Sequence, residues 1–167
     1  VAFLGDYSNT ALDAEGVLIP FKPFFSPKIL PEIYFGRCFQ DNNNPQLWGR
    51  ALNSKEALIG MELLQFLTFF CEKHQFTLKA VDVSKALTES FGQRQVVVTF
   101  VDRYPGKLQP KEYFIRFYYQ NYKKNFNDLL AILKESSKST IKSGEGPLVI
   151  DLRIPRLAFI KGNALKK

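Results

Sequence analysis

The sequence is poor in the residues that most often carry out catalysis or bind metals. It has one histidine, two cysteines, one methionine and one tryptophan among 167 residues. Without a second histidine, Ser–His and Cys–His catalysis have no basis in the sequence. Cys38 and Cys71 have no histidine or acidic residues nearby at zinc-ligand spacing, so we expect free thiols or a disulfide and no metal site. We expect a protein that is not an enzyme and that binds no cofactor.

Long hydrophobic runs are also absent. A membrane helix needs about 18–20 uninterrupted apolar residues. The most apolar segment is interrupted by Gly60, Glu62, Gln65 and Thr68. The chain begins at Val1 with no basic leader followed by an apolar run, so neither a signal peptide nor an anchor is visible. We expect a soluble domain from which an N-terminal segment has been removed.

Aromatic residues are abundant, with 16 phenylalanines and seven tyrosines in a chain that is 46% hydrophobic and 23% charged. This balance and length are typical of one compact domain, spanning residues 1–167. Rigid aromatic rings suit the pleated surface of a sheet. The composition therefore favours a single domain rich in strands.

Positive charge is concentrated in the C-terminal part of the chain. Residues 1–102 contain nine Lys or Arg and eleven Asp or Glu, whereas residues 103–167 contain fourteen and five. An acidic partner would bind this C-terminal part. Nucleic acid, an anionic membrane surface and an acidic protein segment all meet that condition, so charge alone leaves the three open.

The N-terminal third combines a tight turn with proline-rich and polar segments. Leu12–Ile19 predicts a hairpin, because apolar residues flank a polar turn that contains Gly16. Pro20–Pro31 predicts an extended segment, since prolines forbid regular pairing. Ile33–Phe35 predicts a short strand ending at a glycine, and Asp41–Pro45 predicts a loop.

Two segments have helical periodicity. Asn53 and Glu56 form a capping-box variant that opens a helix over Lys55–Lys73, in which the polar residues occupy one narrow stripe. We expect this helix to be mostly buried, with His74 as a solvated imidazolium capping its end. Apolar residues at i, i+3, i+4 and i+7 predict a second helix over Tyr122–Ser136.

The remaining patterns predict strands at 76–83, 95–101, 111–119, 147–154 and 157–160, the first with a bulge or register switch. Loops at 102–110 and 137–146 separate them. The order of strands and helices predicts an α+β domain with a mainly antiparallel sheet and two principal helices.

Other chemical patterns in the sequence are weak. Asp13 and Glu15 flank a turn, where carboxylates stay solvated. Gly144–Pro147 is glycine-rich, but Pro147 lacks an amide donor and a strand follows it, so phosphate binding is disfavoured. A nucleic-acid interface is the best rival hypothesis, because basic and aromatic residues that suit base stacking gather in one region. They are Arg116, Tyr118, Tyr119, Tyr122, Lys123 and Lys124.

The last predicted strand has a different character. In the strand before it, Asp151 and Arg153 occupy one face, and Ile150, Leu152 and Ile154 occupy the other. If 156–162 forms the sheet edge, its free amides and carbonyls invite a strand from a partner whose acidic residues meet the arginines. The alternative is a plain edge strand that its own basic residues protect from pairing.

Four motifs occur in the order known from the β domain of the bacterial cell-division protein family FtsQ/DivIB. Leu12–Gly16 is similar to its opening D-x-x-G hairpin and Leu30–Tyr34 to its LP-containing segment. Phe76–Lys79 follows a long helix as in the family, and Ile150–Arg153 is similar to its DLR strand. The chain resembles this family over about Ala11–Gly162.

The resemblance implies a single-pass protein of the bacterial inner membrane whose extracytoplasmic (periplasmic) domain is a non-catalytic scaffold of the divisome. It implies docking of the coiled-coil division proteins FtsB/DivIC and FtsL by β-strand addition, and no nucleic acid. The family's membrane anchor and POTRA domain (a small polypeptide-transport-associated module) are missing from this chain. Carried over to this sequence, the partner-binding residues are Arg153, Ile154, Arg156, Leu157, Ala158, Phe159 and Ile160.

The sequence departs from the family at Asp41–Asn53, in a longer loop at Asp102–Pro110 and at Pro155. These departures affect the expected docking geometry more than the fold. Another α+β assembly module of the envelope or of a secretion system is a further alternative.

Overall fold

A computed structural model of the chain describes residues 1–7, 9–21, 29–36, 48–103, 110–138 and 146–161. Cys38, the loop at Asp41–Pro45 and most of the predicted proline-rich segment lie outside the described residues, as does Gly144.

The described chain contains nine strands and two long helices. The strands are β1 (Ala2–Leu4), β2 (Thr10–Leu12), β3 (Leu18–Pro20), β4 (Glu32–Tyr34), β5 (Phe76–Lys85), β6 (Gln95–Asp102), β7 (Glu112–Phe117), β8 (Leu148–Asp151) and β9 (Phe159–Lys161). The helices are α1 (Lys55–His74) and α2 (Tyr122–Lys138), and two short 3-10 turns are η4 (Phe91–Gln93) and η5 (Tyr119–Asn121). The α+β class expected from the sequence is confirmed.

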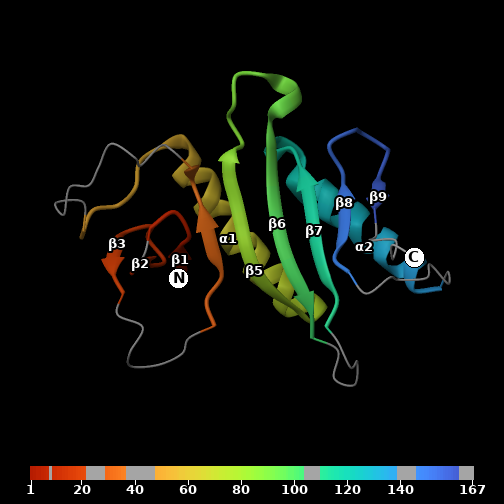
Figure 1. The fold of residues 1–167 in the computed structure, drawn as a ribbon, viewed down its shortest axis with the longest axis horizontal. Coiled ribbons are helices and arrows are strands. Elements are labelled where there is room, and N and C mark those ends of the chain that lie inside the picture. The colour runs from red at the N-terminus through yellow and green to blue at the C-terminus, as the bar shows by residue number, and fades with distance from the viewer. Residues whose placement is uncertain (8, 22–28, 37–47, 104–109, 139–145, 162–167) are drawn as a thin grey trace.

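All nine strands belong to one sheet in the order β3-β2-β1-β4-β5-β6-β7-β8-β9 (Figure 1). Five neighbouring pairs are antiparallel, but β1–β4, β4–β5 and β7–β8 are parallel, so the sheet is mixed. The sequence pattern does not indicate the three parallel pairs, two of which arise from helical crossovers. α1 connects β4 to its neighbour β5, and α2 connects β7 to its neighbour β8. When a helix carries the chain back across the sheet before the next strand begins, the two neighbouring strands run parallel to each other.

The predicted N-terminal hairpin is confirmed. β2 and β3 pair antiparallel, and Gly16 has a φ of 76°, which favours glycine. The Asp13 carboxylate stabilises the turn by accepting hydrogen bonds from the amides of Glu15 (3.0 Å) and Val17 (2.8 Å). This side chain is therefore a turn element, as its position in the sequence indicated.

The two central strands also form as expected. β5 has a register irregularity between Leu78 and Ala80, which is the predicted bulge. Along β6, buried residues alternate strictly with half-buried ones, so one face of the sheet points into the core.

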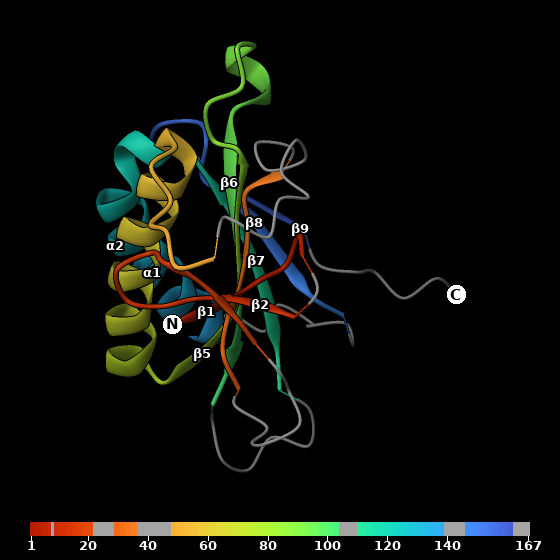
Figure 2. The same cartoon turned by 90° about the vertical axis from the view of Figure 1, so that its left-hand side faces the viewer.

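Both helices pack on that face, and the other face is covered by neither (Figure 2). The core is rich in aromatic rings at the point where the helices meet. Phe126 of α2 lies 5.6 Å from Phe66 and 4.9 Å from Phe70 of α1, and 5.3 Å from Phe117 of β7, all in edge-to-face geometry. These contacts join α1, α2 and the sheet into one two-layer unit.

The ends of α1 differ from the prediction in two details. Its N-cap is Ser54 and not Asn53, and the Ser54 hydroxyl accepts a hydrogen bond from the Ala57 amide (3.1 Å). At its other end the left-handed Gln75 (φ 61°) closes the helix. His74 is half-buried against Phe70, and burial, with the charges of two lysines, lowers its pKa, so a solvated imidazolium is not favoured.

The expectation that α1 is mostly buried is also wrong for its outer side. Leu58 and Phe69 are 62% and 66% exposed. They lie on the same stripe as Glu62 and Gln65, which faces away from the sheet. The sequence does not indicate this exposed side, because the residue type alone cannot distinguish an exposed leucine or phenylalanine from a buried one.

At Gly60, α1 approaches the sheet closely. A Cβ there would lie 2.7 Å from Cδ1 of Ile33 and 2.7 Å from Cε1 of Phe35, both of which are fully buried. In an exposed helix, replacing glycine by alanine raises the free energy of unfolding by about 1 kcal/mol. We expect Gly60→Ala instead to lower it by about 1–3 kcal/mol, because the core around it is already filled.

Urea unfolding measured by circular dichroism would test this. Gly92→Ala is the matched control, because a Cβ at Gly92 meets nothing within 4 Å and should change stability by less than about 0.5 kcal/mol. A Gly60→Ala protein more stable than the parent would contradict the close packing of α1.

Candidate functional site

The two edges of the sheet differ in how their backbone is paired. The outer side of β3 is closed by residues 49–52 of the same chain. The Leu18 amide donates to the Arg50 carbonyl (3.2 Å), and the Gly49 amide donates to the Leu18 carbonyl (2.9 Å). Pro20, at the end of β3, has no amide to donate. This edge is protected against pairing with another chain.

The opposite edge is β9, and among the described residues nothing pairs with its outer side. β9 pairs antiparallel with β8 on one side, and no other strand of the described chain lies on its outer side. Phe159, Ile160 and Lys161 are all exposed, and Phe159 is 57% exposed. The predicted edge position is confirmed, although the strand begins at Phe159, two residues later than expected. Unpaired backbone and exposed apolar side chains occur here together.

A tight turn leads into this edge. The Leu157 amide donates to the Ile154 carbonyl (3.1 Å), Pro155 follows Ile154, and Arg156 has a φ of 65°. A proline followed by a residue with positive φ is typical of a type II turn, whose second central residue is most often glycine. Leu157 is therefore a turn residue and not part of the final strand, and Ala158 links it to β9. Pro155 initiates the turn.

Arg153 has a partner within its own chain. Its guanidinium forms a two-pronged ion pair with Asp151, with Nη2 2.7 Å from Oδ2 and Nε 3.0 Å from Oδ1. Burial raises the pKa of the Asp151 carboxyl, but the hydrogen bonds and charge of Arg153 outweigh it, and the net pKa lies below the usual value. Because Arg153 already pairs with Asp151, Arg156 is the better candidate to meet acidic residues of a partner.

Ile154 also differs from the prediction. It was placed with Ile150 and Leu152 on the core face, but it is 49% exposed whereas these two are buried. The reason is that β8 ends at Asp151, so the alternation of faces stops before Ile154.

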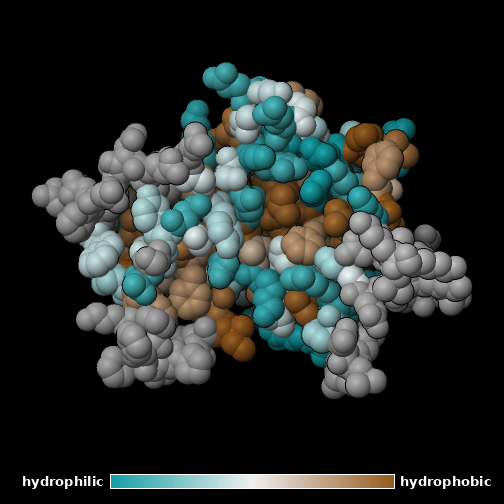
Figure 3. All heavy atoms as spheres, in the orientation of Figure 1, coloured by the Kyte–Doolittle hydropathy of each residue, from teal (hydrophilic) through white to brown (hydrophobic). Residues whose placement is uncertain are grey.

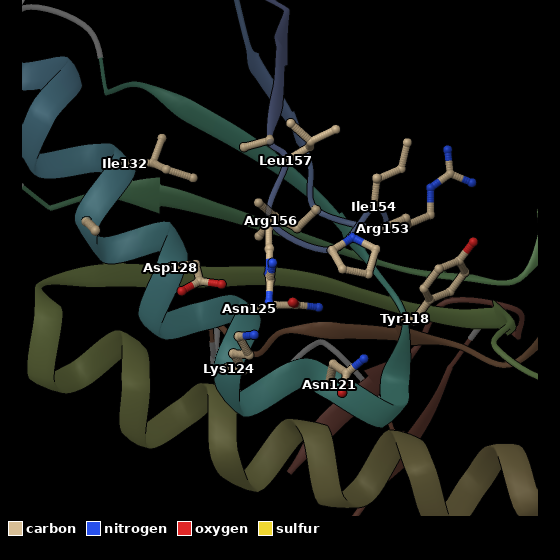
Figure 4. A pocket seen from close by; sticks show the side chains of 14 residues that line it. Tyr118, Asn121, Lys124, Asn125, Asp128, Ile132, Arg153, Ile154, Arg156 and Leu157 are labelled. Carbon is tan, nitrogen blue, oxygen red and sulfur yellow. The ribbon is translucent and has the colours of Figure 1, made fainter.

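A groove of about 450 Å³ lies between this turn and α2 (Figure 4). Arg156 points from the turn toward α2, on which Lys124, Asn125 and Asp128 line the opposite wall. Five of the seven predicted partner-binding residues line this groove, and the other two are on β9. The five are Arg153, Ile154, Arg156, Leu157 and Ala158.

An apolar shelf lies beside the groove, formed by Phe91 at the tip of the β5–β6 hairpin together with Tyr118. Phe91 is 65% exposed and its ring lies 5.2 Å from that of Tyr118, which also lines the groove. The Arg94 guanidinium lies 5.6 Å from the Phe91 ring centre, and Nη1 of Arg153 contacts the Gly92 carbonyl at 3.5 Å. No sequence pattern pointed to this shelf, because its parts are far apart along the chain.

The tyrosines proposed for base stacking are occupied elsewhere. The hydroxyls of Tyr119 and Tyr122 both donate to the Glu62 carboxylate on α1, the latter at 2.7 Å. These two hydrogen bonds lower the pKa of Glu62, and burial followed by the bond to Glu62 raises the pKa of Tyr122 to about 12. Tyr122 thus ties α2 to α1, and Tyr119 ties η5 to it, so both hydroxyls are bonded within the chain.

Other chemistry is sparse in the described part of the chain. Among the described residues, no group of three or more His, Cys, Asp or Glu side chains could hold a metal ion. Burial raises the pKa of the Cys71 thiol to about 12, so it is unreactive at neutral pH. None of the described helices is both long and apolar enough to cross a membrane.

Comparison with known proteins assigns no family: no protein-family model matches the chain, and no curated protein matches its sequence. The site must therefore be interpreted from its own geometry.

Arg156 occupies a backbone conformation that costs a non-glycine residue about 1 kcal/mol or more. We expect Arg156→Gly to raise the free energy of unfolding by about 1 kcal/mol, because glycine adopts this φ without steric cost. Arg156→Ala is the control, since it removes the same charge and keeps the strain. Denaturant unfolding of the three proteins would measure the difference. Equal stability of the glycine and alanine variants would show that the turn is not strained.

Proposed function

We propose that this chain is a non-catalytic docking domain that binds an extended segment of a partner protein as an additional strand beside β9. The observation that supports it most directly is the contrast between the two sheet edges. The chain closes the β3 edge with its own residues 49–52 and leaves β9 open with exposed apolar side chains. An open apolar edge promotes aggregation unless it serves binding.

The energetics suit a specific complex. Each backbone hydrogen bond to an added strand contributes about 1 kcal/mol. Covering the exposed parts of Leu157, Phe159 and Ile160 would contribute on the order of 1 kcal/mol each. Together these gains offset part of the cost of ordering a flexible segment, and side-chain contacts in the groove would supply the remainder.

The charges around the site favour an acidic partner segment. Three basic residues are exposed around the groove and β9, namely Lys124, Arg156 and Lys161. One acidic residue, Asp128 on α2, carries the opposite charge. Asp151 adds little negative field, because Arg153 neutralises it. Acidic residues on the partner would be drawn to this edge and would fix the register of the added strand.

The resemblance to the FtsQ/DivIB β domain suggests which partner this is. The similar motifs occur in the same order along the chain. The residues that correspond to the family's docking strand lie on β9 or line the groove beside it. We infer a divisome scaffold at the extracytoplasmic face of the bacterial inner membrane, which recruits FtsB/DivIC-like and FtsL-like proteins. The main alternative is another envelope or secretion assembly module that uses the same edge.

Mixing the purified domain with the extracytoplasmic segment of a co-occurring FtsB-like protein should give a complex. We expect Phe159→Glu to weaken binding at least tenfold, because it places a charge at the apolar edge. Arg156→Glu should weaken it by a similar factor through charge reversal. The matched control is Phe69→Glu, since Phe69 is at least as exposed as Phe159 but lies on the outer side of α1. Isothermal titration calorimetry would measure all four proteins.

Amide hydrogen exchange would locate the interface. Strand addition predicts slower exchange at Phe159–Lys161 in the complex, with little change at Leu18 and Ile19. Binding that neither edge variant weakens would exclude this site. Binding to DNA or RNA that falls steeply with salt, without binding to the partner segment, would favour the rival hypothesis.

A further inference from the structure

A second hollow, of about 390 Å³, lies at the N-terminal end of the sheet between β1, β4 and the residues that flank the β2–β3 hairpin. Four aromatic rings line its wall. They belong to Phe3, Tyr7, Phe21 and Tyr34, and Glu32 supplies a carboxylate. None of the described residues that line it is basic. The hollow is thus aromatic and acidic in a chain that is basic overall.

Its rings are held in fixed relative positions. Phe3 and Phe21 lie 4.7 Å apart with their planes at 70°, so they form a corner. Tyr34 lies directly over Gly5, where a Cβ would fall 2.3 Å from its Cε1 atom. Only a residue without a side chain allows this approach. The walls are therefore built into the fold and do not depend on a ligand to form.

The carboxylate is also held in place. The Tyr34 hydroxyl donates a hydrogen bond to Glu32, and Glu32 itself is exposed at the rim. This bond, followed by burial and the charges of Glu32, Asp6 and Asp82, raises the pKa of Tyr34 to about 12. The hydroxyl therefore stays protonated at neutral pH, and the negative charge of the site resides on Glu32.

We propose that this hollow binds an organic ammonium ion, either a primary one such as a lysine side chain or a quaternary one such as choline. Aromatic faces attract cations through their quadrupole, and a neighbouring carboxylate adds direct charge attraction. Several aromatic walls with one acidic group are the arrangement by which proteins recognise alkylammonium groups. The site is separate from the β9 edge and does not depend on the docking function.

Chemical-shift titration of the purified domain would test the proposal. We expect choline and Nα-acetyl-lysine amide to shift the resonances of Phe3, Phe21 and Tyr34 with dissociation constants in the millimolar range. The decisive comparison uses 3,3-dimethylbutan-1-ol, the neutral isostere of choline, which should bind at least about tenfold more weakly. The relative affinities of the two cations would show which type of ammonium the hollow prefers.

Two variants connect the binding to the site. Glu32→Gln should reduce choline affinity about fivefold through loss of charge, and Phe21→Leu should reduce it similarly while keeping an apolar contact. The edge variant Phe159→Glu is the control and should leave choline binding unchanged, so that failure at one site is distinguishable from failure at the other. Equal binding of the neutral isostere, or no saturable shift at tens of millimolar choline, would overturn the proposal even if a variant failed to fold.

Discussion

The aromatic contact between the two helices determines where the β9 edge can form. Phe126 of α2 packs against both Phe66 and Phe70 of α1 and against Phe117 of the sheet. Because α2 is held there, the chain that leaves β7 returns as β8 parallel to it, and β9 must follow on the outside. One wall of the groove is α2 itself. The hydrophobic core and the proposed binding surface are therefore parts of one packing arrangement.

The described residues leave two surfaces uncovered, the sheet face opposite the helices and the β9 edge. The two differ in whether another strand is needed to pair their backbone. The sheet face opposite the helices carries apolar side chains at its centre with hydrophilic ones around them (Figure 3). Along β6, Val97, Thr99 and Val101 alternate with the buried core residues and are half-buried, which suits a sheet with one solvated face. The β9 edge lacks such protection, because its backbone has hydrogen-bonding groups that only another strand can pair with regularly.

Local interactions hold the turn before β9, part of the proposed docking edge, in a defined shape. The ion pair between Arg153 and Asp151 fixes the chain just before the turn, and the contact of Arg153 with Gly92 connects it to the β5–β6 hairpin. The left-handed Arg156 then directs its side chain toward the groove. Such preorganisation lowers the entropy cost of binding. A strained residue at the point where the surface must be specific is consistent with a functional role.

The sequence by itself determined the features that depend on near neighbours in the chain. These are the hairpin at Gly16, the bulge in β5, the extents of both helices within a few residues, and an edge strand near Phe159. Turn chemistry and hydrophobic periodicity act over a few residues and can be recognised directly. The tertiary structure alone decided which strands run parallel and that Phe91 meets Tyr118. It also assembled the aromatic hollow around Tyr34. These contacts join residues that are distant in the chain, and their partners are selected by how the helices and strands pack, which no local pattern encodes.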